Sequence, residues 1–169
     1  WKLKKYNKPW ESYDSVNATI GQGYMLSNPL QLAVMAARLA SGRALEPHLM
    51  FDSKRKAAPL LDLPQEHFEL VRQAMADVVS GIGTAAKARL PLPDVRMGGK
   101  TGTAQVRRIT LAERASGVKS NASLQWKYRD HGLFVCFAPT DNPRYACSVV
   151  IEHGGGSGAA YPIARDVMT

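Results

Sequence analysis

The chain has 169 residues, of which 45% are hydrophobic and 21% charged, a composition that fits one globular domain or a large part of one. No apolar run reaches the roughly 18 residues needed to span a bilayer, and the residues from Trp1 to Lys5 are unlike the apolar segment of a signal peptide. We interpret the net charge of +8 as a solvated basic surface and expect no nucleic acid partner, because the basic clusters 54–56 and 107–108 contain no aromatic residues to stack on bases.

The first predicted helix lies after a polar, turn-rich segment of 23 residues that we expect to be a loop. It runs from Leu30 to Ala40, because Asn28 can cap free backbone amides and Pro29 is tolerated at the first helical position. Two apolar stripes run along this helix, which predicts burial on both sides.

A second helix is predicted after an extended connection over residues 43–52. It begins after Pro64, carries Glu66 in its first turn, and is closed by Gly81 and Gly83. Its core positions recur at helical spacing: Phe68, Val71, Met75, Val78 and Val79.

Three strands are predicted in the second half of the chain. The first covers residues 96–107 and is interrupted by glycines, and the second is the continuous apolar run 133–138. The third covers 145–151, after a turn rich in proline. A polar loop from about 108 to 130 joins the first two strands, and no connection contains a crossover helix, so we expect antiparallel pairing.

The cysteines and the C-terminal glycines leave two structural questions. Cys136 and Cys147 fall on neighbouring strands, where a disulfide requires a register that places them opposite each other; two unbonded thiols acting as small apolar residues are the favoured interpretation. Residues 154–158 are predicted to be a flexible hinge before an amphipathic segment over 159–168, because they lack the Lys and Ser/Thr of a phosphate-binding loop.

The stretch with the most chemical information is 98–106, Gly-Gly-Lys-Thr-Gly-Thr-Ala-Gln-Val. Its glycines allow another backbone to approach, so an extended peptide can add itself as a strand. Alternation along the strand puts the hydroxyls of Thr101 and Thr103 on one face, where they can hold a carboxylate, and Lys100 supplies a positive charge beside them. We therefore predict that the ammonium and both hydroxyls converge on a groove for an anionic peptide end. The alternative is a strand that needs glycine only for its twist, with Lys100 in solvent.

Residues 99–105 resemble the Lys-Thr-Gly motif, a signature of penicillin-binding proteins and class A β-lactamases. The chain is most similar to class B penicillin-binding protein transpeptidases, and among them to the elongation-specific penicillin-binding protein 2 group. Further matching segments run across nearly the whole chain: 20–24, 28–31, 137–139, 142–143 and 151–155. The resemblance implies an α/β fold of the α+β type, with an antiparallel sheet flanked by helices as in penicillin-binding proteins and β-lactamases. It also implies that residues 1–169 are the C-terminal portion of a single transpeptidase domain.

The function implied by this resemblance is that of a serine-type peptidoglycan D,D-transpeptidase and β-lactam target. Lys100 would be a catalytic residue in the cleft near the serine of the second family motif. Thr101 and Thr103 would bind the substrate carboxylate, Gly102 would permit close approach, and the amide of Thr103 would donate to the oxyanion. The implied partners are the D-Ala-D-Ala stem peptide, β-lactam antibiotics, membrane proteins of the elongation complex and the upstream part of the same protein. No cofactor or metal is expected. The implied location is the periplasmic face of the bacterial inner membrane, with the anchor upstream of this chain.

The nucleophilic serine of the family is expected upstream of residue 1, so this chain alone should not form an acyl-enzyme. Two Ser-x-x-Lys matches, at Ser53 and Ser116, lie in polar surroundings that would not desolvate the lysine. A Ser-x-Asn match at Ser15 lies too close to the Gly21 segment. We interpret all three as chance matches.

Two other functions compete with transpeptidation. One is a non-catalytic fragment that binds peptide or protein, and the other is a β-lactamase-related hydrolase, which shares the Lys-Thr-Gly strand. The apolar sheet also requires a cover, supplied either by upstream sequence or by a second copy of this chain.

Overall fold

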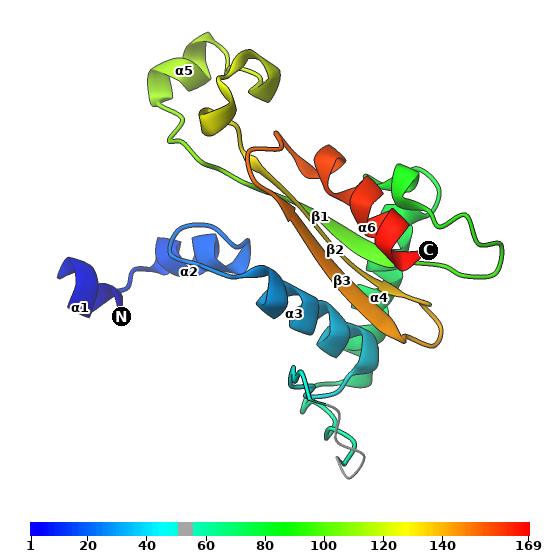
Figure 1. Cartoon of the computed structure of the whole chain (residues 1–169). Helices are drawn as coiled ribbons and strands as arrows, with labels where there is room; N and C mark the ends of the chain where they lie inside the picture. The colour runs from blue at the N-terminus through cyan, green and yellow to red at the C-terminus, as the bar shows by residue number, and fades with distance from the viewer. Residues whose placement is uncertain (51–55) are drawn as a thin grey trace.

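The computed structural model describes residues 1–50 and 56–169. Within these ranges, six helices and three strands follow one another (Figure 1): α1 (Lys2–Tyr6), α2 (Ser12–Thr19), α3 (Pro29–Ser41), α4 (Gln65–Val79), β1 (Gly98–Ala104), α5 (Leu111–Ser116), β2 (His131–Ala138), β3 (Tyr145–Ile151) and α6 (Tyr161–Met168). Short 3-10 turns lie at 86–88, 121–123, 126–128 and 157–159. Within the described ranges, no helix has the length and apolar character to cross a membrane.

The sheet has the order β1-β2-β3, and both pairs are antiparallel, which confirms the predicted pairing. β1 is shorter than predicted, because it begins at Gly98 and ends at Ala104. Cys136 lies directly opposite Cys147, yet the two sulfurs are not bonded. Burial raises the pKa of the Cys136 thiol to about 12, and it raises the pKa of Cys147 as well.

Helices enclose both faces of the sheet (Figure 1). On one face Phe134 and Cys136 pack with Ala160 and Ala164, at the base of α6. On the other face Phe137, together with Val135, packs against α3 and α4. Because successive residues of a strand point to opposite sides, the continuous apolar run of β2 serves both cores at once.

Two glycines of β1 are required by packing inside the sheet. Gly98 and Gly99 are buried, and a Cβ at Gly98 would lie 2.8 Å from the ring carbon Cζ of Phe137. A Cβ at Gly99 would overlap the ring of Phe134. These glycines therefore let the aromatic rings of β2 lie flat against β1.

Helix α3 begins as predicted. The Oδ1 of Asn28 accepts a hydrogen bond from the amide of Gln31 at 2.9 Å, and the amide of Asn28 donates to Oε1 of Gln31 at 3.0 Å. The prediction that α3 is buried on both sides is wrong for the described residues. Ala36 and Ala40 are buried against the sheet, whereas Leu30 and Met35, 59% and 43% exposed, line an outer groove of about 490 Å³. The groove is also lined by Leu61 and Leu63, and by Phe68 from the first turn of α4.

Helix α4 agrees with the prediction at most of its core positions. Phe68, Met75 and Val79 are buried and Val78 is half-buried, but the prediction is wrong at Val71, which is exposed. Ser80 follows the helix, and Gly81 then turns the chain with φ of +62°, a conformation that favours glycine.

The predicted N-terminal loop is wrong, because it contains α1 and α2. A buried ion pair joins Lys2 to Asp14, and the same carboxylate accepts a hydrogen bond from the amide of Glu11 at 2.8 Å. Burial alone would raise the pKa of Asp14, but the hydrogen bonds from Lys2 and Glu11 outweigh it and lower that pKa. The hydrogen bond to Asp14 raises the pKa of Lys2. This contact spans 12 residues, so no local periodicity indicates it.

The glycine-rich segment before α6 is packed against the start of β2. The amide of Gly155 donates to the carbonyl oxygen of Asp130 at 2.8 Å. A Cβ at Gly132 would overlap the carbonyl oxygen of Gly156. The glycines here allow two backbones to touch, and α6 then begins at Tyr161.

Candidate active site on the edge strand

Strand β1 lies at one edge of the sheet, and within the described residues no strand pairs with its outer side. Its buried end holds Gly98 and Gly99, and its other end, from Thr103 to Ala104, is exposed. The strand is thus anchored at one end by packing and open to an added strand along its margin.

The side chains of β1 divide between the two faces of the sheet. Thr101 lies opposite Phe134 and Thr103 opposite Gly132, so both threonines are on the face covered by α6. Lys100 lies opposite Val135 and is therefore on the face of α3 and α4. Its Nζ donates to the carbonyl oxygen of Thr101 at 2.7 Å. The predicted convergence of ammonium and hydroxyls is therefore not found, because neighbouring strand residues alternate.

Lys100 nevertheless remains an available cation. Its side chain is exposed, and none of the ion pairs in the described ranges involves it. Gly102, half-buried opposite Leu133, has only the Cβ of that leucine near the position of a side chain, at 3.2 Å. The middle of β1 thus carries an exposed lysine that is in none of the ion pairs of the described ranges. Beside it, Gly102 has no side chain to keep another backbone away.

A third hydroxyl lies beside the threonines and was missed in the sequence. Oγ1 of Thr84 is 3.4 Å from Oγ1 of Thr101, although 17 residues separate them. The loop around Thr84 is fixed on both sides: a Cβ at Gly83 would overlap the carbonyl of Val78, and the amide of buried Ala85 donates to that carbonyl at 2.9 Å. Only the packing of this loop against β1 reveals the contact.

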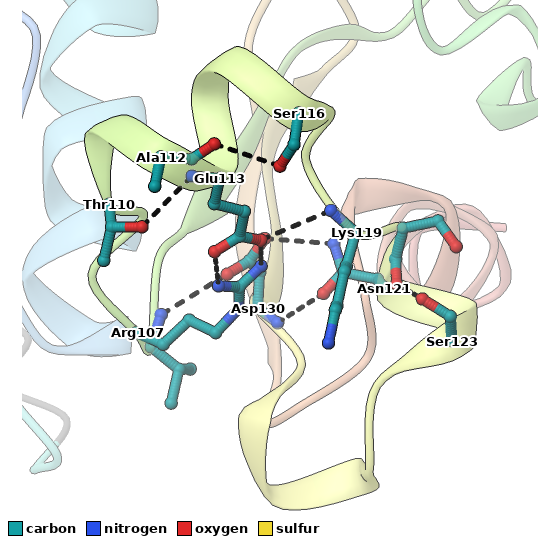
Figure 2. Close-up of polar contacts among 11 residues, drawn as sticks. Arg107, Thr110, Ala112, Glu113, Ser116, Lys119, Asn121, Ser123 and Asp130 are labelled. Atoms are coloured by element: carbon teal, nitrogen blue, oxygen red, sulfur yellow. Dashed lines mark hydrogen bonds and ion pairs between the residues drawn. The ribbon is translucent and has the colours of Figure 1, made fainter.

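The segment between β1 and β2, residues 105–130, is a projecting arm at the exposed end of β1 (Figure 1). We refer to these residues as the arm. The guanidinium of Arg107 makes two hydrogen bonds to the carboxylate of Glu113, at 2.7 and 2.6 Å (Figure 2). These bonds lower the pKa of Glu113 to about 2, against a smaller opposing effect of burial. The amide of Lys119 also donates to this carboxylate, at 3.3 Å.

The base of the arm is closed by a second polar contact. Nδ2 of Asn121 donates to Oδ2 of Asp130 at 3.0 Å, and the amide of Asp130 donates to Oδ1 of Asn121 at 2.8 Å (Figure 2). Oδ1 of Asp130 also accepts from the amide of Val106, at 3.4 Å. One carboxylate therefore ties the two ends of the arm together beside the strand.

Two histidines that are 22 residues apart in sequence meet where the arm joins β2. The amide of His153 donates to Nδ1 of His131 at 2.9 Å, and their ring centroids are 4.7 Å apart. The ring of Trp126 meets the ring of His153 edge-on, and their centroids are 4.5 Å apart. The dispersed spacing of the histidines in sequence did not indicate this pair.

The chance motif matches lie outside the edge strand. Ser116 ends α5, is exposed, and donates to the carbonyl of Ala112 at 3.0 Å. Ser15 lies on exposed α2, where its hydroxyl accepts from Nε1 of Trp10 at 2.9 Å. Ser53 lies outside the described residues. The lysine of the Ser116 match, Lys119, is exposed, in agreement with the rejection of Ser116 as a nucleophile.

Comparison with known proteins assigns nearly the whole chain to one family. The family model of the penicillin binding protein transpeptidase domain matches residues 4–169. The peptidoglycan D,D-transpeptidase MrdA of Haemophilus influenzae is 33% identical over 180 residues, covering 99% of this chain and 27% of that protein. The protein of the same name from Acinetobacter baumannii is 34% identical over 179 residues, covering 99% and 26%. The chain thus spans about a quarter of the length of these curated relatives.

Solved structures give the same assignment. Pseudomonas aeruginosa PBP2 in complex with WCK 5153 superposes with a TM-score of 0.73 at 33% identity, covering 99% of this chain and 36% of that one. Helicobacter pylori PBP2 in its complex with MreC superposes with a TM-score of 0.75 at 28% identity, covering 94% and 27%. The predicted class of fold is confirmed, and the chain is a part of it.

Proposed function

The chain belongs to the penicillin-binding protein transpeptidase family, and from this premise we propose that it is the C-terminal portion of a peptidoglycan D,D-transpeptidase domain. Its part in the reaction is to supply the strand that binds the stem peptide. The observation that carries this proposal is the free margin of β1, with two threonines on one face and a glycine between them. The nucleophilic serine is proposed to lie outside residues 1–169.

The proposed chemistry is acyl transfer in two steps. A serine oxygen attacks the carbonyl between the two D-Ala residues, the terminal D-Ala leaves with a proton on its nitrogen, and an acyl-enzyme ester remains. The amine of a neighbouring stem peptide then attacks that ester, and the serine regains its proton as the cross-link forms. The amide of Thr103 is proposed to stabilise the oxyanion in both steps.

The other residues of β1 would bind and orient the peptide. The hydroxyls of Thr101 and Thr103 are proposed to hold the terminal carboxylate, and Gly102 to let the peptide backbone approach. Lys100, which has no ion-pair partner in the described ranges, is proposed to face a serine supplied by the missing portion. Its hydrogen bond to the carbonyl of Thr101 can be exchanged for that contact.

The parent protein is proposed to act at the periplasmic face of the inner membrane. The H. pylori relative forms a complex with MreC, and the P. aeruginosa relative binds WCK 5153. By similarity we propose β-lactams as inhibitors, and membrane proteins of the elongation machinery as partners, of the full-length protein.

Labelling by a fluorescent penicillin tests the proposal. The full-length protein should become covalently labelled, while residues 1–169 alone should not, and adding the upstream portion should restore labelling. Thr101→Val in the full-length protein should slow labelling about tenfold or more, since a hydrogen bond to a charged group is lost, and Thr101→Ser should retain most of the rate. A full-length protein that is never labelled would refute acyl transfer. Labelling of residues 1–169 alone would refute the absence of the nucleophile, and rapid nitrocefin turnover would instead indicate a β-lactamase.

A further inference from the structure

The arm carries an unusual share of the charge. Its 26 residues, 105–130, contain six basic and two acidic side chains, so this segment holds a net charge of +4 out of +8 for the chain. The acidic side chains are occupied: Glu113 is bound by Arg107, and Asp130 by Asn121. None of the ion pairs in the described ranges involves the four remaining exposed cations, Arg108, Arg114, Lys119 and Lys127.

The arm also exposes aromatic surface in a fixed arrangement. Trp126 and Tyr128 are 61% and 45% exposed, and Nζ of Lys127 lies 5.0 Å from the centre of the Tyr128 ring. The edge-on contact with His153 holds Trp126 against the body of the protein. These contacts orient Trp126 and pair Lys127 with Tyr128 before any ligand binds.

The position of the arm relates it to the peptide-binding strand. Val106 is two residues beyond the end of β1, and its amide is tied to Asp130, the residue immediately before β2. The arm therefore projects from the end of β1 that bears Thr103 (Figure 1). A polymer whose peptide lies along β1 would extend directly onto it.

We propose that the arm is a docking surface for an acidic glycopeptide strand, a length of peptidoglycan adjoining the peptide held on β1. This inference rests on the proposed function. Free carboxylates of stem peptides would meet the unpaired cations, and sugar rings would lie on the exposed aromatic rings. A membrane surface is disfavoured because insertion into the lipid interface needs a helix with a distinct apolar face, and the six residues of α5 are too few to form one.

The test separates polymer binding from chemistry at the strand. In the full-length protein, the triple variant Arg108→Glu, Arg114→Glu, Lys127→Glu reverses charge on the arm and leaves the contacts of Glu113 and Asp130 intact. The matched control reverses three exposed lysines elsewhere, Lys8→Glu, Lys56→Glu and Lys87→Glu. Each protein is tested for sedimentation with purified, lipid-free peptidoglycan sacculi, for sedimentation with phosphatidylglycerol vesicles, and for the rate of labelling by fluorescent penicillin.

The arm variant should bind sacculi about tenfold more weakly, whereas the control should change little, because each lost surface contact contributes modestly. Its penicillin labelling should stay within about twofold, since a small β-lactam need not reach the arm, and this also shows that the variant folds. Binding of the unmodified protein to sacculi should weaken from about 0.05 M to about 0.5 M salt.

Three results would overturn the docking surface: equal loss of sacculus binding in the arm variant and the control, no loss in either, or loss only of binding to phosphatidylglycerol vesicles. Each of these can be observed in a protein that penicillin still labels, so the proposed transpeptidation would stand. A protein that binds sacculi through the arm but is never labelled by penicillin would support the docking surface and refute the proposed transpeptidation.

Discussion

The sheet and the arm are held together by different forces. In the sheet, Phe134 and Phe137 are fully buried, and the facing glycines of β1 leave room for their rings. In the arm, no residue between 105 and 130 is buried, and shape depends on the Arg107–Glu113 pair and on Asn121 with Asp130. A strand fixed by apolar packing thus carries a neighbouring polar segment, and we expect the stability of that segment to respond to pH and salt.

The largest effect should come from emptying the core. Phe134→Ala in the full-length protein should lower the free energy of unfolding by about 3–5 kcal/mol, because it leaves a cavity between the sheet and α6. Trp126→Ala, the matched aromatic change in the arm, should cost under about 1 kcal/mol. Denaturant unfolding measures both, and equal losses would show that the arm is packed as tightly as the sheet.

A smaller effect should distinguish the two kinds of glycine on β1. Gly99→Ala should cost about 1–3 kcal/mol of stability, because its methyl group would overlap the ring of Phe134. Gly102→Ala, whose methyl group meets only the Cβ of Leu133, should cost less stability and should slow penicillin labelling instead. Thermal unfolding and labelling rates give the two readouts. Loss of stability at Gly102 with unchanged labelling would contradict its role in peptide approach.

Next in size is the closure of the arm. Asn121→Ala removes two hydrogen bonds to Asp130, so the arm should lose about 1–2 kcal/mol of local stability. Hydrogen exchange of amides in 105–130 should accelerate while exchange in β2 stays unchanged. Ser123→Ala, which removes a bond within one 3-10 turn, is the control. Faster exchange throughout the sheet would mean that the two regions unfold as one.

The smallest effect should be the response of the arm to acid. The pKa of Glu113 is lowered from 4.5 to about 2, so its contribution to stability is complete above pH 4.5 and is lost as the pH falls through 2. Proteolysis of the arm by an acid-active protease should therefore become faster as the pH is lowered from 4.5 to about 2. In Glu113→Gln the arm should be cleaved readily throughout and show no such rise. A rise of equal size in the variant would assign the acid response to another group.

The sequence was informative where structure follows from local pattern. Asn28 with Pro29 predicted the start of α3, and helical spacing predicted α4, because capping and periodicity act within a few residues. The motif Thr110-x-x-Glu113 also predicts a helix start, and it would have located α5 inside the polar loop: the amide of Glu113 donates to Oγ1 of Thr110 at 3.2 Å.

Contacts between residues far apart in the sequence could not be predicted from local pattern. The contact of Thr84 with Thr101 depends on how a loop packs on an edge strand, and the pairing of Lys2 with Asp14 depends on how two short helices fold together. The face occupied by Lys100 followed from strand alternation, yet the expectation that three polar groups converge overrode it. Charge and proximity in sequence do not place side chains on the same side of a sheet.

The thiol of Cys136, which lies opposite Cys147, can report how often this sheet opens. Alkylating reagents attack the thiolate, and with the pKa of Cys136 at about 12 almost none forms near neutral pH while the strands remain closed. Modification of that sulfur is therefore confined to the moments when α6 lifts away or β2 and β3 separate. The rate at which Cys136 is alkylated therefore measures how often these openings occur, and no probe has to be engineered into the protein.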